Sequence, residues 1–214
     1  MTNDATTDAV ESEHEVIAEL YGFCAGVLAD PPEPAAIRQL TATGLPDPEA
    51  APNDQLRHGF ELLDRWRCSV DDAADVAADL ERTHTALFVG PRPDLQVHES
   101  YYADDFLGKP LARVQGSYRE LGIEPAPDLR EEADHAAVEL AALALLTRRE
   151  KADNQDKAFF LREHAWWFEE LAADIAETAD SEFYRGVGAI AAGLVRLDAE
   201  RMEIELADPV PAEA

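Results

Sequence analysis

The most informative run of this chain reads ADHAAVELAALALLTR and covers residues 133–148. Over residues 136–146 its only charged side chain is that of Glu139, and the others are small or apolar. A helix that is apolar on nearly every side is buried in a protein, so this run predicts a central helix over about 128–150. A buried carboxylate needs a polar partner, and His135, one turn earlier on the same face, is the nearest in sequence.

The pair of His135 and Glu139 is compatible with three interpretations. It can lock the central helix as a structural pair, it can belong to a recognition or functional site, or it can form part of a metal site. The sequence pattern leaves all three open.

Helical spacing of apolar residues recurs on both sides of this run. It predicts further helices at residues 16–28, 34–42, 53–69, 71–88, 110–121, 154–178 and 181–203. Residues 43–53 contain three prolines and a glycine and predict a loop, whereas residues 90–105 predict an irregular segment. Strand-type alternation is absent from the sequence, so we predict an all-α fold, a single-domain helical bundle of about eight to ten helices.

The predicted domain organisation has three parts. Residues 1–12 are expected to form a flexible acidic tail, residues 13–205 an all-helical domain, and residues 206–214 a second flexible tail. The acidic N-terminus lacks the basic and apolar regions of a signal peptide, and the longest near-apolar run is about half of a membrane span. We therefore expect a cytoplasmic protein without stable membrane insertion.

The charge balance is strongly acidic. The chain has 214 residues with 18 Lys and Arg against 45 Asp and Glu, which gives a formal net charge of −27. This excludes a general nucleic-acid binder, whose phosphate contacts need basic side chains, and argues against an anionic membrane surface as partner. Only three of the basic residues are lysines. Such a surface is typical of a salt-adapted cytoplasm, where molar salt screens self-repulsion; an acidic surface built for a cationic partner is the alternative.

The irregular segment holds a second candidate site, His98-Glu99-Ser100-Tyr101-Tyr102. Aromatic and hydrogen-bonding groups on an ordered loop suit peptide binding. The alternative is a structural loop, pinned by tyrosines that pack on the helices.

Three Glu-x-x-His pairs support a different hypothesis: Glu11–His14, Glu81–His84 and Glu132–His135. Two such motifs with two further glutamates make a di-metal carboxylate site in a ferritin-like four-helix bundle. Chance supplies much of this pattern in so glutamate-rich a chain, so the di-metal enzyme is kept as the alternative function.

Cofactor motifs are otherwise missing from the sequence. There is no Walker loop, dinucleotide-binding glycine motif, nucleophile elbow or zinc-type Cys/His spacing. The aromatic residues of segment 159–168 share a helical stripe with His164, and such a stripe is more often core than a cofactor site. His164 is therefore expected to be an interior histidine with satisfied hydrogen bonds.

Three segments carry a family resemblance. The first is Leu87-Phe88, then a proline-containing loop, then Glu99-Ser100 with Tyr102. The second is Tyr118-x-x-x-Gly122 followed by Asp134-His135-x-x-x-Glu139-Leu140. The third is Phe160-Leu161-x-x-His164, then Trp167 and Phe183-Tyr184. In this order, over about residues 80–200, they resemble the TorD/DmsD/NarJ family of cytoplasmic chaperones, whose signature is Asp-His-x-x-x-Glu-Leu.

The resemblance implies a concrete function. Such proteins are all-helical, hold no metal or cofactor of their own and are not enzymes. They bind the twin-arginine signal peptide and the body of an exported apo-reductase of the dimethyl sulfoxide, trimethylamine N-oxide or nitrate reductase type. They delay export until the molybdopterin cofactor is inserted, and a monomer or a homodimer is expected.

The resemblance also implies which residues bind the client. They are Asp134 and His135 with Glu99, Ser100 and Tyr102, and we add Glu139 and His98 from the same two segments as candidate client-binding residues. His98 stands where the family usually has Trp or Tyr, and His84 where Tyr is common. A carboxylate such as Asp134 can accept a bidentate guanidinium contact, and we expect this acid to be partly buried.

Overall fold

The computed structural model describes residues 3–43, 45–126, 129–149 and 155–206, with side chains from residue 13 onward. This part of the chain contains ten α-helices, two short helical turns and no β-strand. The helices are α1 (Asn3–Ala29), α2 (Pro34–Ala42), α3 (Asp54–Cys68), α4 (Ala73–His84), α5 (Glu99–Tyr102), α6 (Lys109–Glu120), α7 (Ala136–Arg148), α8 (Gln155–His164), α9 (Phe168–Thr178) and α10 (Glu182–Arg201). The turns are the 3₁₀ turn η1 (Pro48–Ala50) and the π turn η2 (Thr85–Val89). The predicted all-α fold is confirmed.

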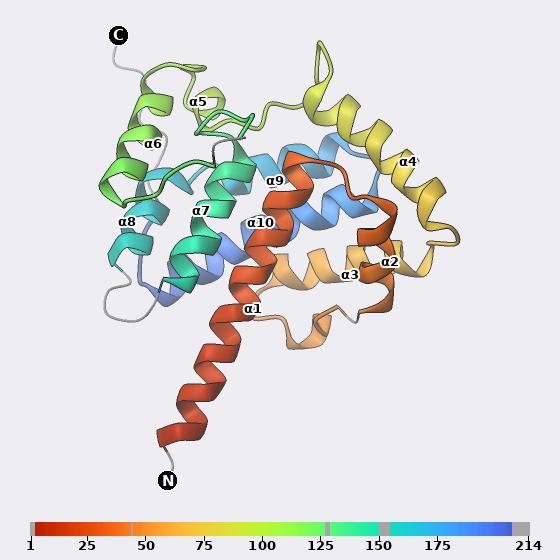
Figure 1. The fold of residues 1–214 in the computed structure, drawn as a ribbon, viewed down its shortest axis with the longest axis horizontal. Helices are drawn as coiled ribbons and strands as arrows, with labels where there is room; N and C mark the ends of the chain where they lie inside the picture. Colours follow the sequence, from red (N-terminus) through yellow and green to blue (C-terminus); the bar gives the residue numbers. More distant parts are fainter. Residues whose placement is uncertain (1–2, 44, 127–128, 150–154, 207–214) are drawn as a thin grey trace.

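The first helix is longer than the apolar pattern predicted. α1 begins at Asn3 instead of residue 16, and its first turns project away from the rest of the molecule (Figure 1). The backbone is therefore helical within the stretch 1–12, and the flexibility of that tail stays a prediction. Residues 207–214 of the second predicted tail lie outside the described residues. No helix among the described residues is both long enough and apolar enough to cross a membrane.

The last helix, α10, lies at the centre of the bundle and is buried along most of its length. It packs against α3, α9 and α1, and α1 also packs along α7; Figure 1 shows α1 crossing between α7 and α3. The contact between α3 and α10 requires a glycine at position 59. A Cβ atom there would lie 2.6 Å from Ile190 Cγ1 and 3.0 Å from the carbonyl oxygen of Gly186, so a side chain would force the helices apart.

A buried polar cluster ties α1, α8 and α10 together. The Tyr21 hydroxyl donates to Asp198 Oδ2 at 2.7 Å, and Lys157 Nζ lies 2.6 Å from the same oxygen. All three residues are buried, and burial lowers the pKa of the Lys157 ammonium while the Asp198 carboxylate opposes that shift. Losing one partner would leave a buried charge uncompensated, so this pair fixes α8 against α10.

The central helix starts later than predicted, because α7 begins only at Ala136. His135 adopts the extended conformation (φ −75°, ψ 140°), and its Nδ1 accepts the Ala137 N–H at 3.1 Å as an N-cap. The N–H of Ala136 donates to the carbonyl oxygen of Val97 at 2.8 Å. This contact with a distant segment overrides the helical propensity of the residues before it.

The long helix predicted over 154–178 is two helices, α8 and α9, separated by residues 165–167. Neither proline nor glycine marks the break in the sequence. It is held by contacts on both sides, since His164 bonds to Glu99 and Trp167 bonds to α7. The change of direction between α8 and α9 brings the side chains of His164 and Trp167 to the buried carboxylates of Glu99 and Glu139.

The helix predicted over 71–88 is α4 followed by a π turn, and the irregular segment after it contains a helix that was not predicted. The π turn η2 is closed by the N–H of Gly90, which donates to the carbonyl oxygen of Thr85 at 2.8 Å. Further along, Glu99–Tyr102 form the one-turn helix α5 inside the stretch predicted to be irregular. This segment passes directly beside the start of α7, where the candidate site lies.

Candidate functional site

The backbone joins the two predicted site segments. An isolated antiparallel bridge pairs His98 with His135, and the N–H of Glu99 donates to the carbonyl oxygen of Asp134 at 2.9 Å. Two segments that are far apart in sequence, residues 98–102 and 134–139, therefore meet beside α5 and the start of α7. We call the residues of these two segments the signature residues.

Asp134 is completely buried, where the sequence predicted a partly buried acid. Its Oδ2 accepts the backbone N–H of Ser100 at 3.1 Å, and its Oδ1 is buried without a hydrogen-bond partner. The Ser100 hydroxyl in turn accepts the N–H of Leu107 at 2.9 Å. In this structure, Asp134 and Ser100 hold the shape of the loop that follows α5.

Glu99 is also completely buried and organises three helices. Its Oε2 accepts from His164 Nδ1 at 2.9 Å, and its Oε1 accepts from Trp166 Nε1 at 3.3 Å. The other ring nitrogen of His164 lies 2.8 Å from Ser117 Oγ on α6. The prediction of an interior His164 with satisfied hydrogen bonds is confirmed.

The chain Ser117–His164–Glu99 has the hydrogen-bonding order of a catalytic triad. Ser117, however, lies inside the regular helix α6 and is only 8% exposed. A nucleophile must reach its substrate, so this arrangement fits a structural relay between α6, α8 and α5 and not an acyl-transfer site.

Glu139 is buried on α7, as predicted. We expected His135 to be its hydrogen-bond partner, but the partner in the structure is Trp167. Glu139 Oε2 accepts the Trp167 Nε1–H at 3.0 Å, and its Oε1 has no partner. Burial raises the pKa of the Glu139 carboxyl well above its usual value, and the negative charge of Glu99 raises it further. Glu139 therefore holds a proton over a wider pH range than an exposed glutamate does.

His135 is neutral at physiological pH. Burial lowers the pKa of its imidazole to about 3, because the charged form would lose its hydration. The ring is occupied by capping α7, and its Nε2 lies 3.8 Å from Glu131 Oε2. Its role in this structure is to end the extended segment and start the helix.

His98 packs against two neighbouring aromatic rings. Its ring contacts the His135 ring edge-to-face at a centroid distance of 5.1 Å and the Phe106 ring at 5.5 Å. Burial lowers the pKa of His98, while the carboxylates of Asp134 and Glu131 oppose that shift. Its Nδ1 is buried without a partner.

The loop was predicted either to bind a peptide or to be pinned by tyrosines that pack on the helices. Each of its two tyrosines fits one of these interpretations. Tyr102 packs on Trp167 at 5.2 Å, and its hydroxyl donates to Asp174 Oδ2 at 2.9 Å, so it pins the loop to α9. Burial and that hydrogen bond raise the pKa of Tyr102. Tyr101 instead faces solvent and is 49% exposed.

Several residues of this site were not predicted. Ser117, Trp166 and Trp167 supply hydrogen bonds to the buried network; Trp167 belonged to the resemblance, but it carried no predicted role. Phe106 and Leu107 are exposed beside Tyr101. Their one signal in the sequence is a pair of apolar residues directly after two aspartates.

The predicted Glu-x-x-His pairs do not come together as a metal site. Glu81 and Glu132 are exposed while His84 and His135 are buried, so the two members of each pair lie in different surroundings. His84 packs between Phe88 and Tyr184 instead. The side chain of Glu11 lies outside the described residues. Within the described part of the chain, no group of three or more His, Cys, Asp or Glu side chains is placed to bind a metal ion.

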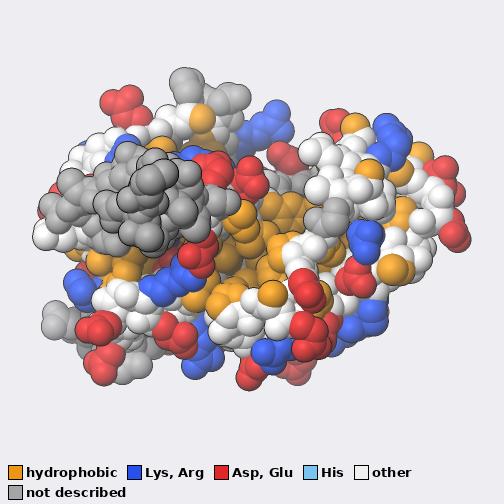
Figure 2. Space-filling model, turned by 90° about the horizontal axis from the view of Figure 1, so that it is seen from below, with side chains coloured by type: hydrophobic (Ala, Val, Ile, Leu, Met, Phe, Trp, Pro, Cys, Tyr) orange, Lys and Arg blue, Asp and Glu red, His pale blue; other side chains and the backbone are white. Residues whose placement is uncertain are grey.

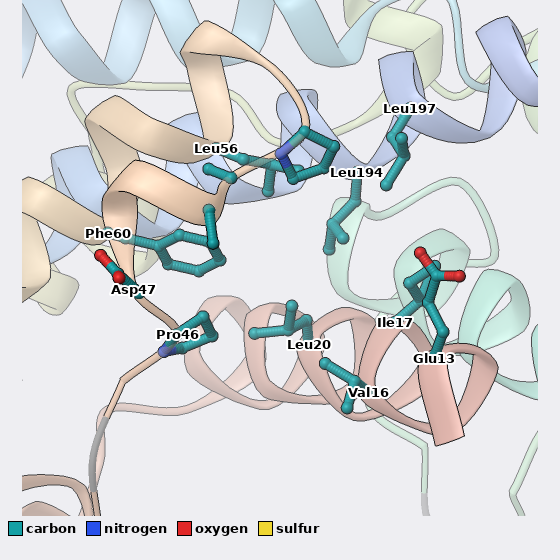
Figure 3. Close-up of a pocket in the computed structure, with 13 residues that line it drawn as sticks. Glu13, Val16, Ile17, Leu20, Pro46, Asp47, Leu56, Phe60, Leu194 and Leu197 are labelled. Atoms are coloured by element: carbon teal, nitrogen blue, oxygen red, sulfur yellow. The ribbon is translucent and has the colours of Figure 1, made fainter. Parts of the chain in front are cut away.

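A second surface region is an apolar groove between α1, η1, α3 and α10, with a volume of about 150 Å³. Figure 3 shows Val16, Ile17 and Leu20 of α1 along one side, facing apolar residues of α3 and α10. On the face shown in Figure 2, apolar side chains gather in the middle and acidic side chains lie around them. The groove shares no residue with the buried network beside α5.

Comparison with known proteins identifies the family. The family model described as nitrate reductase delta subunit matches residues 45–173, which is more than half of the chain. The matched region contains both site segments, all of α5, α6, α7 and α8, and the first half of α9. None of the curated proteins searched matches the chain. The chain belongs to the nitrate reductase delta subunit family, a family of chaperones for the maturation of redox enzymes.

Proposed function

We propose that this protein is a cytoplasmic chaperone, adapted to high salt, for an exported molybdopterin-containing reductase of the dimethyl sulfoxide, trimethylamine N-oxide or nitrate reductase type. It binds the twin-arginine signal peptide and the apo form of that client, and it assists cofactor insertion before export. The protein itself is not an enzyme. The observation that carries the proposal is the convergence of the signature residues from segments 98–102 and 134–139 in one network beside a loop with exposed aromatic side chains.

The chemistry of the site suits an arginine-containing peptide. Asp134 keeps one carboxylate oxygen without a hydrogen-bond partner, and Glu131 lies close enough to His98 for its negative charge to oppose the lowering of the His98 pKa by burial. Carboxylates bind guanidinium groups by charge-assisted, often bidentate hydrogen bonds. Because Asp134 is completely buried, an arginine reaches it only when the segment around Ser100 shifts, whereas Glu131 is partly exposed and available from the start.

Binding of a precursor in molar salt tests the proposal. Immobilised protein is expected to capture a twin-arginine reductase precursor and to release it when both arginines of the precursor are replaced by lysine, since a lysine cannot make the bidentate contact. The double variant Asp134→Ala, His135→Ala is expected to weaken capture. Asp180→Ala, which removes an exposed acid between α9 and α10, serves as the control.

Circular dichroism separates loss of binding from loss of the fold in these variants. If the double variant stays folded and captures the precursor as well as the wild type does, Asp134 and His135 do not belong to the site. If the wild-type protein captures no precursor at any salt concentration, the proposed function is wrong.

A further inference from the structure

Three exposed apolar side chains belong to the short segment 101–107, next to the buried signature. They are Tyr101, Phe106 and Leu107, and they are 49%, 52% and 45% exposed. The rings of Tyr101 and Phe106 meet edge-to-face at 6.5 Å, and Phe106 also contacts His98. Apolar side chains clustered on the surface mark interaction sites more often than single ones do. We call this set the 101–107 ridge.

The backbone of the ridge is held in an unfavourable conformation. Asp104 and Leu107 both have a φ of 55°, in the left-handed region. An aspartate tolerates this region, but a leucine rarely adopts it, so Leu107 is the strained residue. Such strain persists only where surrounding contacts impose it, and it gathers at functional sites. Here the N–H of Leu107 donates to the Ser100 hydroxyl at 2.9 Å, and the N–H of Asp105 donates to the Ser100 carbonyl oxygen at 3.0 Å.

The far end of the loop is fixed as well. The Asp105 carboxylate accepts the N–H of Lys109 at 2.9 Å at the start of α6. It also fills the space beside Gly108, where a Cβ atom would lie only 2.1 Å from Asp105 Oδ1. The loop is thus fixed at both ends. These contacts keep Phe106 and Leu107 exposed, although they hold the backbone of Leu107 in a strained conformation.

The charges around the ridge indicate what kind of partner fits it. Asp104 and Glu132 are exposed, and Asp105 and Glu131 are partly exposed. Acidic side chains beside an apolar surface favour a partner segment that carries basic groups next to apolar residues. A second copy of this chain fits poorly, because it would bring the same acidic side chains, close enough to escape screening, against these ones.

We propose that the 101–107 ridge is the surface on which the client's apolar segment, flanked by basic side chains, docks. In this assignment Ser100 and Asp134 are positioning residues that shape the ridge, while Tyr101, Phe106 and Leu107 make the contact. The proposal rests on the proposed function, because it takes the reductase precursor to be the partner.

The test uses a substitution that removes the side chain without straining the backbone. Leu107→Asn keeps a residue that tolerates the left-handed region and replaces the apolar side chain with a polar one. Val16→Asn on α1 is the matched control, because Val16 is also 45% exposed but lies in the groove. Capture of the reductase precursor in molar salt is measured for both variants and for Phe106→Ala.

Leu107→Asn and Phe106→Ala are each expected to weaken precursor capture by roughly tenfold or more, as interface hot spots do. Leu107→Asn should keep the wild-type unfolding midpoint or raise it, whereas a purely structural Leu107 would give a lower midpoint. Val16→Asn should capture the precursor normally.

Four other outcomes contradict the assignment. Normal capture by both ridge variants, with capture still lost in the Asp134 and His135 double variant, removes the ridge and leaves the proposed function standing. Equal losses of capture in Leu107→Asn and Val16→Asn show that the effect is not specific to the ridge. No capture by the wild-type protein rejects both proposals together. A wild-type dimer that Phe106→Ala converts to a monomer shows that the ridge binds a second copy instead.

Discussion

The apolar groove and the 101–107 ridge both present apolar side chains to solvent, but they are built differently. The groove is formed mainly by regular helices, and none of its lining residues has a buried polar atom without a partner or a left-handed backbone. The ridge contains Asp104 and Leu107, two of the three described residues other than glycine with positive φ. Beside it lie three of the five buried side-chain atoms without a partner in the described chain, His98 Nδ1, Asp134 Oδ1 and Glu139 Oε1.

This difference indicates that the groove is a by-product of helix packing, whereas the 101–107 ridge is maintained for recognition. Strained residues and unpaired buried polar atoms cost stability, so a fold that retains several of them in one place does so for a reason other than stability. We therefore assign recognition to the end of the molecule that contains α5, which we call the signature end. We assign a structural role to the end that contains the groove, which we call the groove end.

The largest effect is expected at the signature end, from Trp167→Ala. Trp167 is completely buried, packs on Tyr102 and donates to Glu139. Its removal should lower the free energy of unfolding by about 4 kcal/mol, through the cavity and the lost hydrogen bond together. Urea denaturation measures the loss. Trp166→Ala, at a half-buried neighbour, should cost clearly less, and equal losses would contradict the central place given to Trp167.

A smaller loss is expected at the groove end, from Gly59→Val. The new side chain would overlap Ile190 and the backbone of α10, so the free energy of unfolding should fall by about 3 kcal/mol. Capture of the precursor by the folded protein should stay normal. Gly22→Ala is the opposite control, because nothing lies within 4 Å of the added methyl group and helical alanine is favoured by about 0.5–1 kcal/mol. Lost capture in a folded Gly59 variant would argue against a purely structural groove end.

A third prediction concerns how the stability of the fold depends on pH through His135, at the signature end. The folded-state pKa of His135 is about 3, well below the ordinary value of about 6.5. The unfolded chain therefore binds a proton more readily between these values, and stability falls as the pH drops below about 6.5, by at most about 1.4 kcal/mol per pH unit. His135→Asn keeps an N-cap for α7 but cannot titrate. Its stability should match the wild type near neutral pH and fall less steeply under acid, and parallel curves would show that His135 contributes nothing to the acid sensitivity.

The helices were predictable from the sequence because apolar periodicity follows burial directly. The late start of α7 was not predictable, since it depends on backbone hydrogen bonds from Ala136 to Val97 and from Glu99 to Asp134, which form only when the distant segment before α5 packs against it. The break between α8 and α9 was missed for the same reason, because distant partners on α5 and α7 impose it.

The site was predictable in its residues but not in its geometry. The signature located Asp134, Glu99 and Ser100, but no pattern indicates that Asp134 is completely buried. The left-handed conformation of Leu107 lacks its usual marker, a glycine at that position. Contacts that form only in the folded protein therefore decide which of these residues are buried and which are exposed.

Hydrogen–deuterium exchange of the full chain, with and without the reductase precursor in molar salt, tests the central claim most directly. We expect the precursor to slow exchange over residues 97–109 and 131–136, where the ridge and the signature lie, and to leave residues 46–60 beside the groove unchanged. Protection confined to residues 46–60, with no change over 97–109, would contradict the claim that recognition belongs to the signature end.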